Sequence, residues 1–303
     1  MDELPEMDNP YHGLQVIDKP AGMTSRDAVD RAQRWFPKAT RIGHTGTLDP
    51  LATGVLVLCI GVATRLAEYV QAMKKTYRAG FILGARSNTD DADGILTPAL
   101  AVEAPDERLV AATLKTFEGD QDQVPPAFSA AKVTGRRAYK LARQGLSLEL
   151  QPRRVTIYQI AMLAYRFPNL AVEIECGKGT YVRALARDLG ECLGCGAYVN
   201  ILRRTRVGVF HVAEAISFEA SAAEVREGLQ PIERAVAELP RVVVATDAVA
   251  LLRQGQFLAA VTVKGEATSE TDCAAFDPSG VLVAVVRRSA EDQRWSPTKV
   301  LKV

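Results

Sequence analysis

The 303-residue chain is long enough for two domains of ordinary size, and its 48% hydrophobic and 24% charged residues are typical of a globular protein. Its 37 Lys and Arg residues nearly balance its 36 Asp and Glu residues, so any surface that binds nucleic acid must be a local concentration of positive charge. No apolar run approaches the roughly 18 residues of a transmembrane helix. The first ten residues are acidic and hold no base, which predicts a cytoplasmic protein without a targeting segment.

The five cysteines are scattered and odd in number, which argues against a disulfide framework. Cys192 and Cys195 form one C-x-x-C pair, but the sequence has no second pair at the spacing of a four-ligand zinc site. We therefore predict no metal site, and we interpret the cysteines as small packing residues.

The first predicted elements are a strand over residues 14–18, a turn over residues 19–22 and a helix that ends near residue 36. Thr24 and Asp27 have the spacing of a capping box, in which each side chain satisfies a backbone N–H group at the start of the helix.

Residues 43–54, with the sequence GHTGTLDPLATG, combine three glycines with one histidine, one proline and one carboxylate. Pro50 fixes its own φ and disfavours a helical conformation at Asp49, so this carboxylate is predicted to lie on a stiff turn. The apolar run over residues 55–60 predicts a strand that is buried on both faces. A carboxylate on a rigid loop beside such a strand suits catalysis. The alternative is an Asp that only caps its own turn.

The middle of the chain alternates helices, strands and turns. A helix is predicted over residues 64–72 and a strand over residues 76–84, in which Tyr77 starts an apolar face of period two. Residues 89–94 predict an acidic turn between two strands. They do not start a calcium loop, because a loop beginning at residue 89 would need a Glu at its twelfth position and has none there. A helix over residues 105–117 follows.

Residues 132–154 hold the clearest concentration of positive charge. Seven bases stand there against one acid, Glu149, in a chain that is otherwise balanced. This excess favours contact with phosphate groups over a solvated helix face. The seven bases are Lys132, Arg136, Arg137, Lys140, Arg143, Arg153 and Arg154.

A half-buried strand is predicted over residues 170–176 and a helix over residues 181–193. Tyr181 and Arg183 fall in the first turn of this helix, where the helix dipole disfavours a base. Such local conflicts often mark functional sites.

The last part of the chain predicts a second, smaller unit. Helices are predicted over residues 217–229 and 231–239, with a domain boundary near Pro240. The remaining residues read as a small β-rich module of about 60 residues, near the lower limit for independent folding. Its predicted strands cover residues 241–245, 258–263, 273–276 and 281–287.

Five motifs follow one another along the chain, and their order together is much more specific than any one of them alone. They are VIDKPAG at residues 16–22, GHTGTLDPLATGVL at 43–56, KTYR at 75–78, GKGTYVR at 177–183, and LGCGA at 193–197 leading into LRR at 202–204. Over residues 13–210 the sequence resembles the TruB family of tRNA pseudouridine-55 synthases. The resemblance implies an α+β fold whose central mixed, mostly antiparallel sheet carries flanking helices over residues 10–239. It also implies that residues 132–154 are an inserted loop that closes over RNA, and that residues 240–303 are similar to a PUA-type RNA-binding module.

By this resemblance, the chain isomerises uridine 55 in the T loop of tRNA to pseudouridine. The base is flipped out, the bond between ribose C1′ and N1 breaks, the uracil turns, and C5 joins C1′. No electrons or groups enter or leave, so we expect no cofactor and no metal. We expect a monomer whose partner is the T stem-loop of tRNA, with no membrane partner.

The resemblance also implies the site residues. Asp49 is the catalytic carboxylate, which either attacks C1′ or removes the ribose 2′ proton, and Arg183 pairs with it. The other implied roles surround the flipped base: Tyr77 stacks on it, Tyr181 lies beside it, His44 fills the gap it leaves, Leu202 lines its pocket, and Lys19 and Pro20 form the floor. The implied contacts to the RNA backbone come from Lys132, Arg136, Arg137, Lys140 and Arg143. The alternative for Tyr77 and Leu202 is that they only pack in the core. The alternative for the other residues is that they only occupy a turn or the start of a helix.

Two alternative functions stay open at this point. One is a tRNA-binding or tRNA-folding protein without catalysis, which needs no particular residue at position 49. The other is a hydrolase with Asp49 as its nucleophile, which needs a second carboxylate nearby as general acid or base. The motifs contain no such carboxylate.

Overall fold

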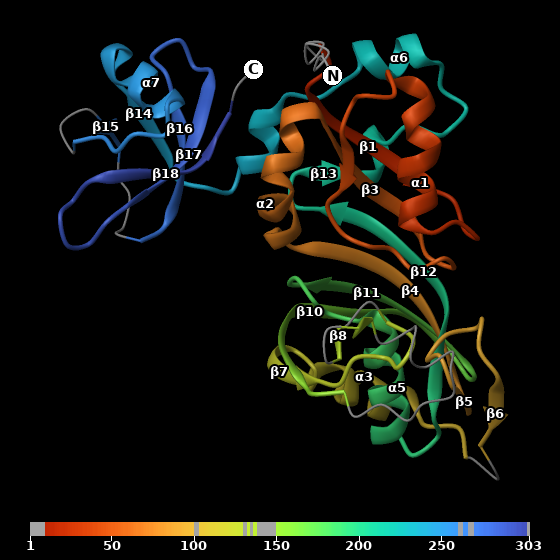
Figure 1. The fold of residues 1–303 in the computed structure, drawn as a ribbon. Coiled ribbons are helices and arrows are strands. Elements are labelled where there is room, and N and C mark those ends of the chain that lie inside the picture. The colour runs from red at the N-terminus through yellow and green to blue at the C-terminus, as the bar shows by residue number, and fades with distance from the viewer. Residues whose placement is uncertain are drawn as a thin grey trace.

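The computed structural model describes residues 10–99, 103–129, 150–259, 263–265 and 270–301, and only the backbone of residues 132–133 and 136–137. Within these residues the chain forms a nine-stranded sheet, a five-stranded sheet near the C-terminus and two short hairpins (Figure 1). In the large sheet, β3 and β12 are parallel neighbours and the other neighbouring strands are antiparallel. The predicted α+β class with a mixed, mostly antiparallel sheet is therefore confirmed.

The large sheet has the strand order β1-β3-β12-β4-β11-β10-β7, with β2 paired to β3 and β13 paired to β12. Its strands are β1 Gly13–Lys19, β2 Ile42–His44, β3 Thr53–Ile60, β4 Lys75–Leu83, β7 Gly119–Gln123, β10 Arg153–Arg166, β11 Asn169–Cys176, β12 Ala197–Val207 and β13 Phe210–His211.

The inner strands follow the hydrophobic patterns of the sequence. Seven residues of β3 in succession are buried, as expected for an apolar run that is covered on both faces. On β4, Tyr77, Ala79 and Phe81 are buried, whereas Arg78 is exposed. Because side chains alternate along a strand, Thr76 and Arg78 lie on the opposite face of the sheet from Tyr77.

Helices cover one face of the large sheet and enclose the main core. In the described part of the chain they are α1 Ser25–Ala32, α3 Glu107–Lys115, α5 Val182–Cys192 and α6 Ala222–Glu227. α1 starts at the predicted capping box of Thr24 and Asp27. α5 packs on β12 and β4 (Figure 1). It buries the expected apolar side with Leu185 and Leu189. The face that α5 covers is therefore the one that holds Tyr77.

The opposite face carries a second core at the β1 and β3 end of the sheet. The elements that cover it are η2 Gly61–Leu66, α2 Ala67–Ala72 and η4 Ile232–Val236, of which η2 and η4 are 3₁₀ helices. Side chains of the C-terminal β-rich unit join the same core.

The C-terminal unit is a five-stranded sheet with the order β15-β14-β16-β17-β18. Its elements are β14 Arg241–Val244, α7 Thr246–Arg253, β15 Val263–Lys264, β16 Asp272–Phe276, β17 Leu282–Arg288 and β18 Trp295–Val300. The strands expected near residues 241, 273 and 281 are present, whereas α7 and β18 were not predicted.

Alternation along β16 divides its side chains between two cores. Cys273 and Ala275 belong to the unit's own core, which also includes residues of α7. Ala274 and Phe276 belong to the second core of the large sheet, together with Val70 of α2. The C-terminal unit thus packs one face of its sheet against the rest of the chain.

Three predicted helices are shorter or tighter than expected. The segment 64–72 begins as the 3₁₀ helix η2 before it continues as α2. Of residues 217–229 only α6 is helical, because Ser221 caps its start and Gly228 follows its end. Residues 231–239 form only η4. Helices this short are marginal in isolation, so the packing of their apolar side chains stabilises them more than helix propensity does.

The shared core predicts that the two parts of the chain unfold together. Phe276 is 7% exposed and packs in that core. We expect Phe276→Ala to lower the free energy of unfolding by about 3–5 kcal/mol, because it leaves a cavity, and to keep one cooperative transition. Urea unfolding followed by tryptophan fluorescence measures both, with the exposed Val281→Ala as control. A separate low-stability transition in the variant would show that the C-terminal unit folds independently.

Candidate active site

Asp49 lies in the connection between β2 and β3, here called the Asp49 loop (residues 45–52). Side chains from other elements hold the backbone of this loop. The buried hydroxyl of Ser25, at the start of α1, accepts a hydrogen bond from Leu48 N at 2.8 Å and donates one to Leu48 O at 3.1 Å. Because both backbone groups of Leu48 are bonded, the residue before Asp49 has a fixed orientation.

Lys19 holds the other side of Asp49. Its side chain is fully buried. The Nζ atom donates to the carbonyl oxygens of Pro20 at 2.8 Å, Met23 at 2.6 Å and Pro50 at 3.3 Å. Burial lowers the pKa of Lys19 to about 8, with Asp49 opposing the shift and Arg204 adding to it. The lysine therefore ties the turn after β1 to the Asp49 loop.

Arg204 on β12 fastens the loop from a third direction. Its buried guanidinium donates from Nη2 to Gly46 O at 3.1 Å and from Nε to Val55 O at 2.8 Å. Nη1 lies 3.5 Å from the hydroxyl oxygen of Tyr77, a long contact that brings this ring beside the loop. Burial raises the pKa of Tyr77, and the charge of Arg204 opposes this shift, so the phenol is neutral near pH 7.

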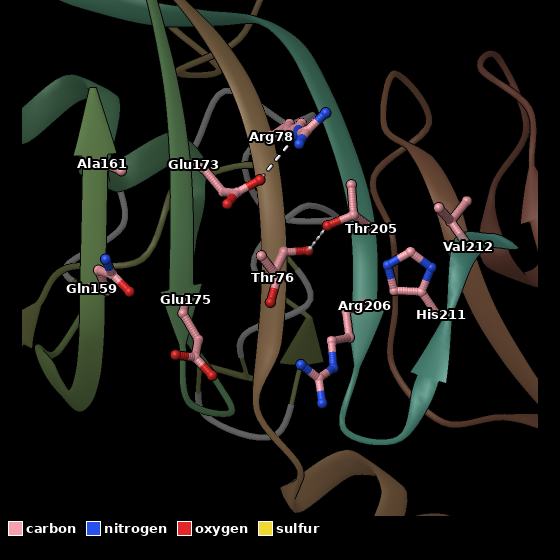
Figure 2. Close-up of a pocket in the computed structure, with 10 residues that line it drawn as sticks. All are labelled: Thr76, Arg78, Gln159, Ala161, Glu173, Glu175, Thr205, Arg206, His211 and Val212. Carbon is pink, nitrogen blue, oxygen red and sulfur yellow. Dashed lines mark hydrogen bonds and ion pairs between the residues drawn. The ribbon is translucent and has the colours of Figure 1, made fainter. Parts of the chain in front are cut away.

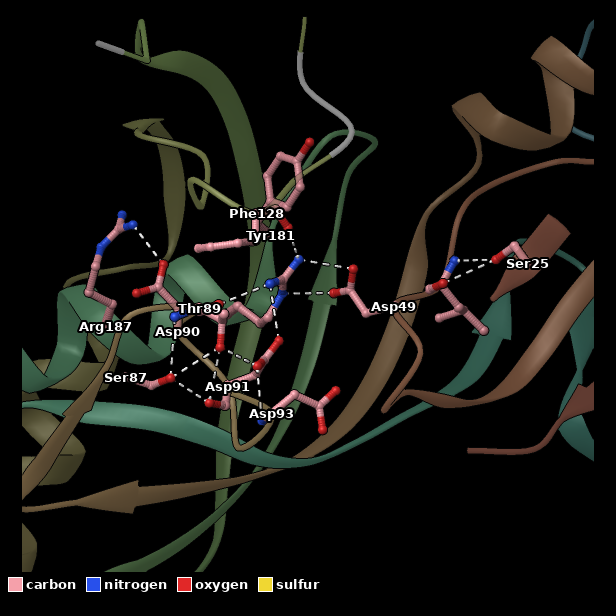
Figure 3. A network of polar contacts seen from close by, with 12 residues as sticks. Ser25, Asp49, Ser87, Thr89, Asp90, Asp91, Asp93, Phe128, Tyr181 and Arg187 are labelled. Carbon is pink, nitrogen blue, oxygen red and sulfur yellow. Dashed lines mark hydrogen bonds and ion pairs between the residues drawn. The ribbon is translucent and has the colours of Figure 1, made fainter. Parts of the chain in front are cut away.

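Arg183, in the first turn of α5, joins the carboxylates of Asp49 and Asp91. Figure 3 labels both of these aspartates. Its Nη2 donates to Asp49 Oδ1 at 2.9 Å, and its Nε lies 2.8 Å from Asp49 Oδ2 as an ion pair without hydrogen-bond geometry. Its Nη1 donates to Asp91 Oδ2 at 3.0 Å. The carbonyl oxygens of Thr89 and Phe128 accept further bonds at 2.9 and 3.1 Å. The contact between Arg183 and Asp49 that the resemblance implied is therefore present.

The acidic turn over residues 89–94 supplies carboxylates that sequence reasoning missed as site residues. Asp91 pairs with Arg183, and Asp90 pairs with Arg187 at 2.9 Å. Burial raises the pKa of Asp90, and Arg187 opposes this shift. One signal in the sequence could have suggested the pairing: two arginines four residues apart lie on one side of a helix and match two successive acids.

The arrangement leaves one of the two carboxylates accessible. The side chain of Asp49 is 30% exposed, whereas that of Asp91 is 6% exposed. Arg183 compensates the charge of Asp49 where water is partly excluded. The Asp49 loop fixes the direction of the Asp49 side chain. Asp49 is thus an oriented anion, which suits a nucleophile or a general base.

Three of the predicted base-binding residues lie in the main core or at the start of α5. Tyr77 and Leu202 are buried in the same core cluster as Leu48. Tyr181 is half-buried and forms the N-cap of α5, two residues before Arg183. Their positions are compatible with the predicted roles toward a flipped base, which stay predictions.

His44 and Pro20 lie at the borders of the pinned segments. His44 ends β2 and is half-buried, and its Nδ1 accepts a hydrogen bond from Gly46 N at 3.3 Å. Pro20 is exposed in the turn whose carbonyl groups bind Lys19.

Only part of the predicted RNA-backbone set is described by the structure. The backbone of β8 Lys132–Val133 pairs with that of β9 Arg136–Arg137 as a short hairpin. Lys140 and Arg143 lie outside the described residues.

The last two bases of the predicted 132–154 insertion lie in the large sheet. Arg153 and Arg154 are the first residues of β10 and pair with Gln123 and Asp122 of β7. The Nη1 atom of Arg154 also lies 3.7 Å from Oδ2 of Asp122. The apolar alternation that begins at Val155 draws both arginines into the strand, because sheet pairing continues beyond the first buried side chain.

A hollow of about 430 Å³ lies on the opposite face of the sheet (Figure 2). Arg78 and Glu173 form an ion pair at 2.8 Å across it, and Thr205 Oγ1 donates to Thr76 O at 3.3 Å. Thr76 and Arg78 alternate with Tyr77 on β4, so this hollow is separated from the Asp49 loop by the sheet itself.

The cysteines at positions 59, 176, 192, 195 and 273 are free thiols. Over the described residues, no group of three or more His, Cys, Asp or Glu side chains is arranged to hold a metal ion. None of the helices in that part of the chain has the length and apolar character to cross a membrane.

The close approach of β12 to β3 predicts a severe effect at Gly54. Its φ is +99°, and a Cβ atom there would lie 2.2 Å from Arg204 O. We expect Gly54→Ala to lower the free energy of unfolding by more than about 3 kcal/mol, since backbone strain of roughly 1–2 kcal/mol is added to a backbone collision. Denaturant unfolding measures the change.

Gly179→Ala is the matched control, because Gly179 has a φ of +86° and open space around its missing Cβ. It should cost only about 1 kcal/mol. Equal losses in the two variants would mean that the close approach of β12 to β3 at Gly54 is not tight.

Two family models match the chain. The model for the TruB family pseudouridylate synthase (N terminal domain) matches residues 34–182, and the model for the tRNA pseudouridylate synthase B C-terminal domain matches residues 183–237. Together they cover more than half of the sequence.

The chain is also similar to curated proteins named tRNA pseudouridine synthase B. The protein of Azoarcus sp. (strain BH72) is 42% identical over 81% of this chain and 83% of its own length. The proteins of Dehalococcoides mccartyi (strain CBDB1) and Xanthomonas campestris pv. campestris (strain B100) are 39% and 40% identical, over 95% and 96% of this chain and 96% and 94% of theirs.

Among solved structures, a chain from the crystal structure of a Cbf5-Nop10-Gar1 complex is similar to this one. It is 26% identical and has a TM-score of 0.76, over 99% of this chain and 87% of that one. A chain from an H/ACA RNP bound to a substrate RNA containing 2′-deoxyuridine shares the fold, with a TM-score of 0.74, 24% identity, and coverage of 96% and 85%. The family models and the relatives together show that this chain belongs to the TruB family of tRNA pseudouridine synthases and is an isomerase of that class.

Proposed function

We propose that this chain isomerises uridine 55 in the T loop of tRNA to pseudouridine, with Asp49 as the carboxylate that acts at ribose C1′. The observation that carries the proposal is the buried Arg183 guanidinium, which orients the accessible Asp49 and is itself held by the buried Asp91. The name of the relatives, tRNA pseudouridine synthase B, supports tRNA as the substrate class.

The reaction rearranges bonds within one nucleotide. The C1′–N1 bond breaks, and the uracil leaves with the electron pair of that bond. After the base has turned, C5 bonds to C1′, the proton of C5 is released, and N1 takes up a proton. Uridine and pseudouridine contain the same atoms, so the balance needs no oxidant, reductant or group donor.

Asp49 can act by either of two routes. Attack of a carboxylate oxygen on C1′ forms a covalent adduct, which C5 of the turned uracil then displaces. Alternatively, Asp49 removes the ribose 2′ proton to give a glycal and later returns it. Both routes need an ionised carboxylate at a fixed position, and the contact with Arg183 supports such a state.

The surrounding residues would bind the flipped base. Tyr77 offers a neutral aromatic face, Leu202 offers an apolar wall, and Tyr181 stands near the helix start that carries Arg183. An extruded base loses its stacking partners, so an aromatic platform offsets part of that cost. We assign His44 to the space that the base vacates, and Lys19 and Pro20 to the floor of the site.

We further propose a division of labour along the chain. Residues 10–239 would carry the chemistry, and residues 240–303 would contact RNA as a PUA-like module. Lys132, Arg136, Arg137, Lys140 and Arg143 would bind phosphates of the T stem-loop. Positive charge at that stretch is the observation that supports this assignment.

The surroundings of Asp91 argue against the hydrolase alternative. A hydrolase would use a second carboxylate near Asp49 as an acid or base. Asp91 is the neighbouring candidate, but its side chain is 6% exposed. Its oxygens are also engaged, because Arg183 donates to Oδ2 and Thr89 Oγ1 donates to Oδ1 at 2.5 Å. A carboxylate in that position supports Arg183 rather than a water molecule.

Asp49→Asn tests the proposed chemistry. The amide keeps the shape of the side chain but is neither a nucleophile nor a base, so we expect the single-turnover rate of pseudouridine formation to fall more than about a thousandfold. Affinity for unmodified tRNA should change little. Asp30→Asn on the exposed side of α1 is the matched control, because it replaces an acid that pairs only with Arg26 in the described contacts.

The measurement is pseudouridine formation at saturating enzyme, read by chemical mapping of the tRNA. Turnover by Asp49→Asn at close to the parent rate would reject Asp49 as the reacting group. Binding of tRNA by the parent without any conversion would instead favour the tRNA-binding protein without catalysis.

Replacing Arg136, Arg137 and Lys140 together by Ala tests the proposed phosphate contacts. Each lost contact removes one charge interaction with the RNA backbone, so the slope of log affinity against log salt should flatten by at most about one unit per contact. Filter binding of tRNA at several salt concentrations measures the slope. An unchanged slope would place these three side chains in solvent in the complex.

A further inference from the structure

Gln123, the last residue of β7, makes two hydrogen bonds to Tyr181, the N-cap residue of α5. Its side chain is almost completely buried, with 2% exposure. Its Oε1 accepts from Tyr181 N at 2.8 Å, and its Nε2 donates to Tyr181 O at 3.1 Å. One amide thus binds both backbone groups of one residue, 58 positions away in the sequence.

The orientation of the amide follows from its partners. A backbone N–H group can only donate and a carbonyl oxygen can only accept, so the reversed amide would place like groups against each other at both contacts. In the observed orientation, both backbone groups of Tyr181 are satisfied away from water. Gln123 therefore specifies one position for this residue.

Tyr181 needs an external support because it caps α5 without a side-chain hydrogen bond. Its backbone is extended, with φ −103° and ψ 108°, and its carbonyl oxygen also accepts from Leu185 N at 3.1 Å. The chain turns there from the loop into the helix. The bonds from Gln123 hold this change of direction, and so they set where the Tyr181 ring leaves the backbone.

The segment after Gln123 holds the same part of α5. Val124 O accepts a hydrogen bond from Arg187 Nη2 at 2.8 Å, and Phe128 O accepts one from Arg183 Nη2 at 3.1 Å. Residues 123–128 therefore bond to Tyr181, Arg183 and Arg187, which lie at the N-cap and in the first two turns of the helix. In these hydrogen bonds Gln123 uses its side chain, whereas Val124 and Phe128 use their backbone carbonyl groups. Gln123 can therefore be tested by substitution.

We propose that Gln123 is a positioning residue for the isomerisation, and that it acts through Tyr181. The proposal rests on the proposed function, in which Tyr181 lies beside the reacting base. With both backbone bonds in place, Tyr181 has one position relative to Asp49. Without them, the N-cap of α5 relaxes and the ring spreads over several positions, so fewer bound complexes have the geometry for reaction.

The test is a double-mutant cycle in single-turnover pseudouridine formation with unmodified tRNA at saturating enzyme. Gln123→Met keeps the length of the side chain and removes both hydrogen bonds. We expect it to slow the reaction about tenfold or more, while tRNA affinity stays within about threefold. In a Tyr181→Ala background, the same substitution should cost less than about threefold, because the ring that Gln123 positions is gone.

Gln121→Met is the matched control. Gln121 lies two residues earlier on β7 with the same alternation, and its Nε2 donates to Phe117 O rather than to α5. We expect its rate to stay within about twofold of the parent. Urea unfolding of every variant ensures that the rates are compared between folded proteins.

Gln123→Glu takes the place of the Met variant if the latter does not fold, since it keeps the acceptor for Tyr181 N. Equal losses in the parent and Tyr181→Ala backgrounds, an unchanged rate in Gln123→Met, or loss of the fold in both Gln123 variants would each overturn the proposal. Asp49→Asn in the same assay separates the two hypotheses. If it is inactive while Gln123→Met is unimpaired, only the role of Gln123 fails; if it is active, the proposed function fails.

Discussion

One buried guanidinium determines the geometry of the site. Arg183 sits between an accessible carboxylate, Asp49, and a buried one, Asp91, and its remaining bonds go to backbone carbonyl groups. A buried charge without partners would be costly, so the structure around it must supply them. The position of Arg183 in the first turn of α5 is unfavourable for the helix dipole, and the two carboxylates offset that cost. The arginine in turn gives Asp49 a fixed direction.

The same principle holds for the backbone near the site. Ser25, Lys19 and Arg204 are buried polar side chains that bond to the Asp49 loop and its flanks. Gln123 does the same for Tyr181. A loop that is held at several independent points cannot relax when one neighbour moves, so the carboxylate stays in place. Polar groups that are buried and fully bonded also specify a single arrangement better than apolar contacts do.

The second core links the site's scaffold to the C-terminal unit. Phe276 and its neighbours bury apolar surface against α2 and η4. Two polar contacts lie at the same boundary: the Tyr69 hydroxyl donates to Asp272 at 3.0 Å, and Lys299 pairs with Glu68 at 2.6 Å. Exposed ion pairs stabilise little, so the apolar contacts carry most of this attachment. An RNA that touched both parts would therefore meet two surfaces with a fixed relation.

The sequence by itself predicted many of the elements and the position of Asp49 on a stiff turn. Capping at Thr24, alternation along β4 and the constraint of Pro50 on Asp49 are local properties, so they can be recognised without the fold. Only the tertiary structure decided which groups meet at the site. Arg183 contacts Asp49 across 134 positions and Asp91 across 92, and many other arginine–acid pairings fit the same sequence. The roles of Asp91, Arg204 and Gln123 depend on such distant contacts, because sheet pairing and helix packing, not local preference, bring their partners within bonding distance.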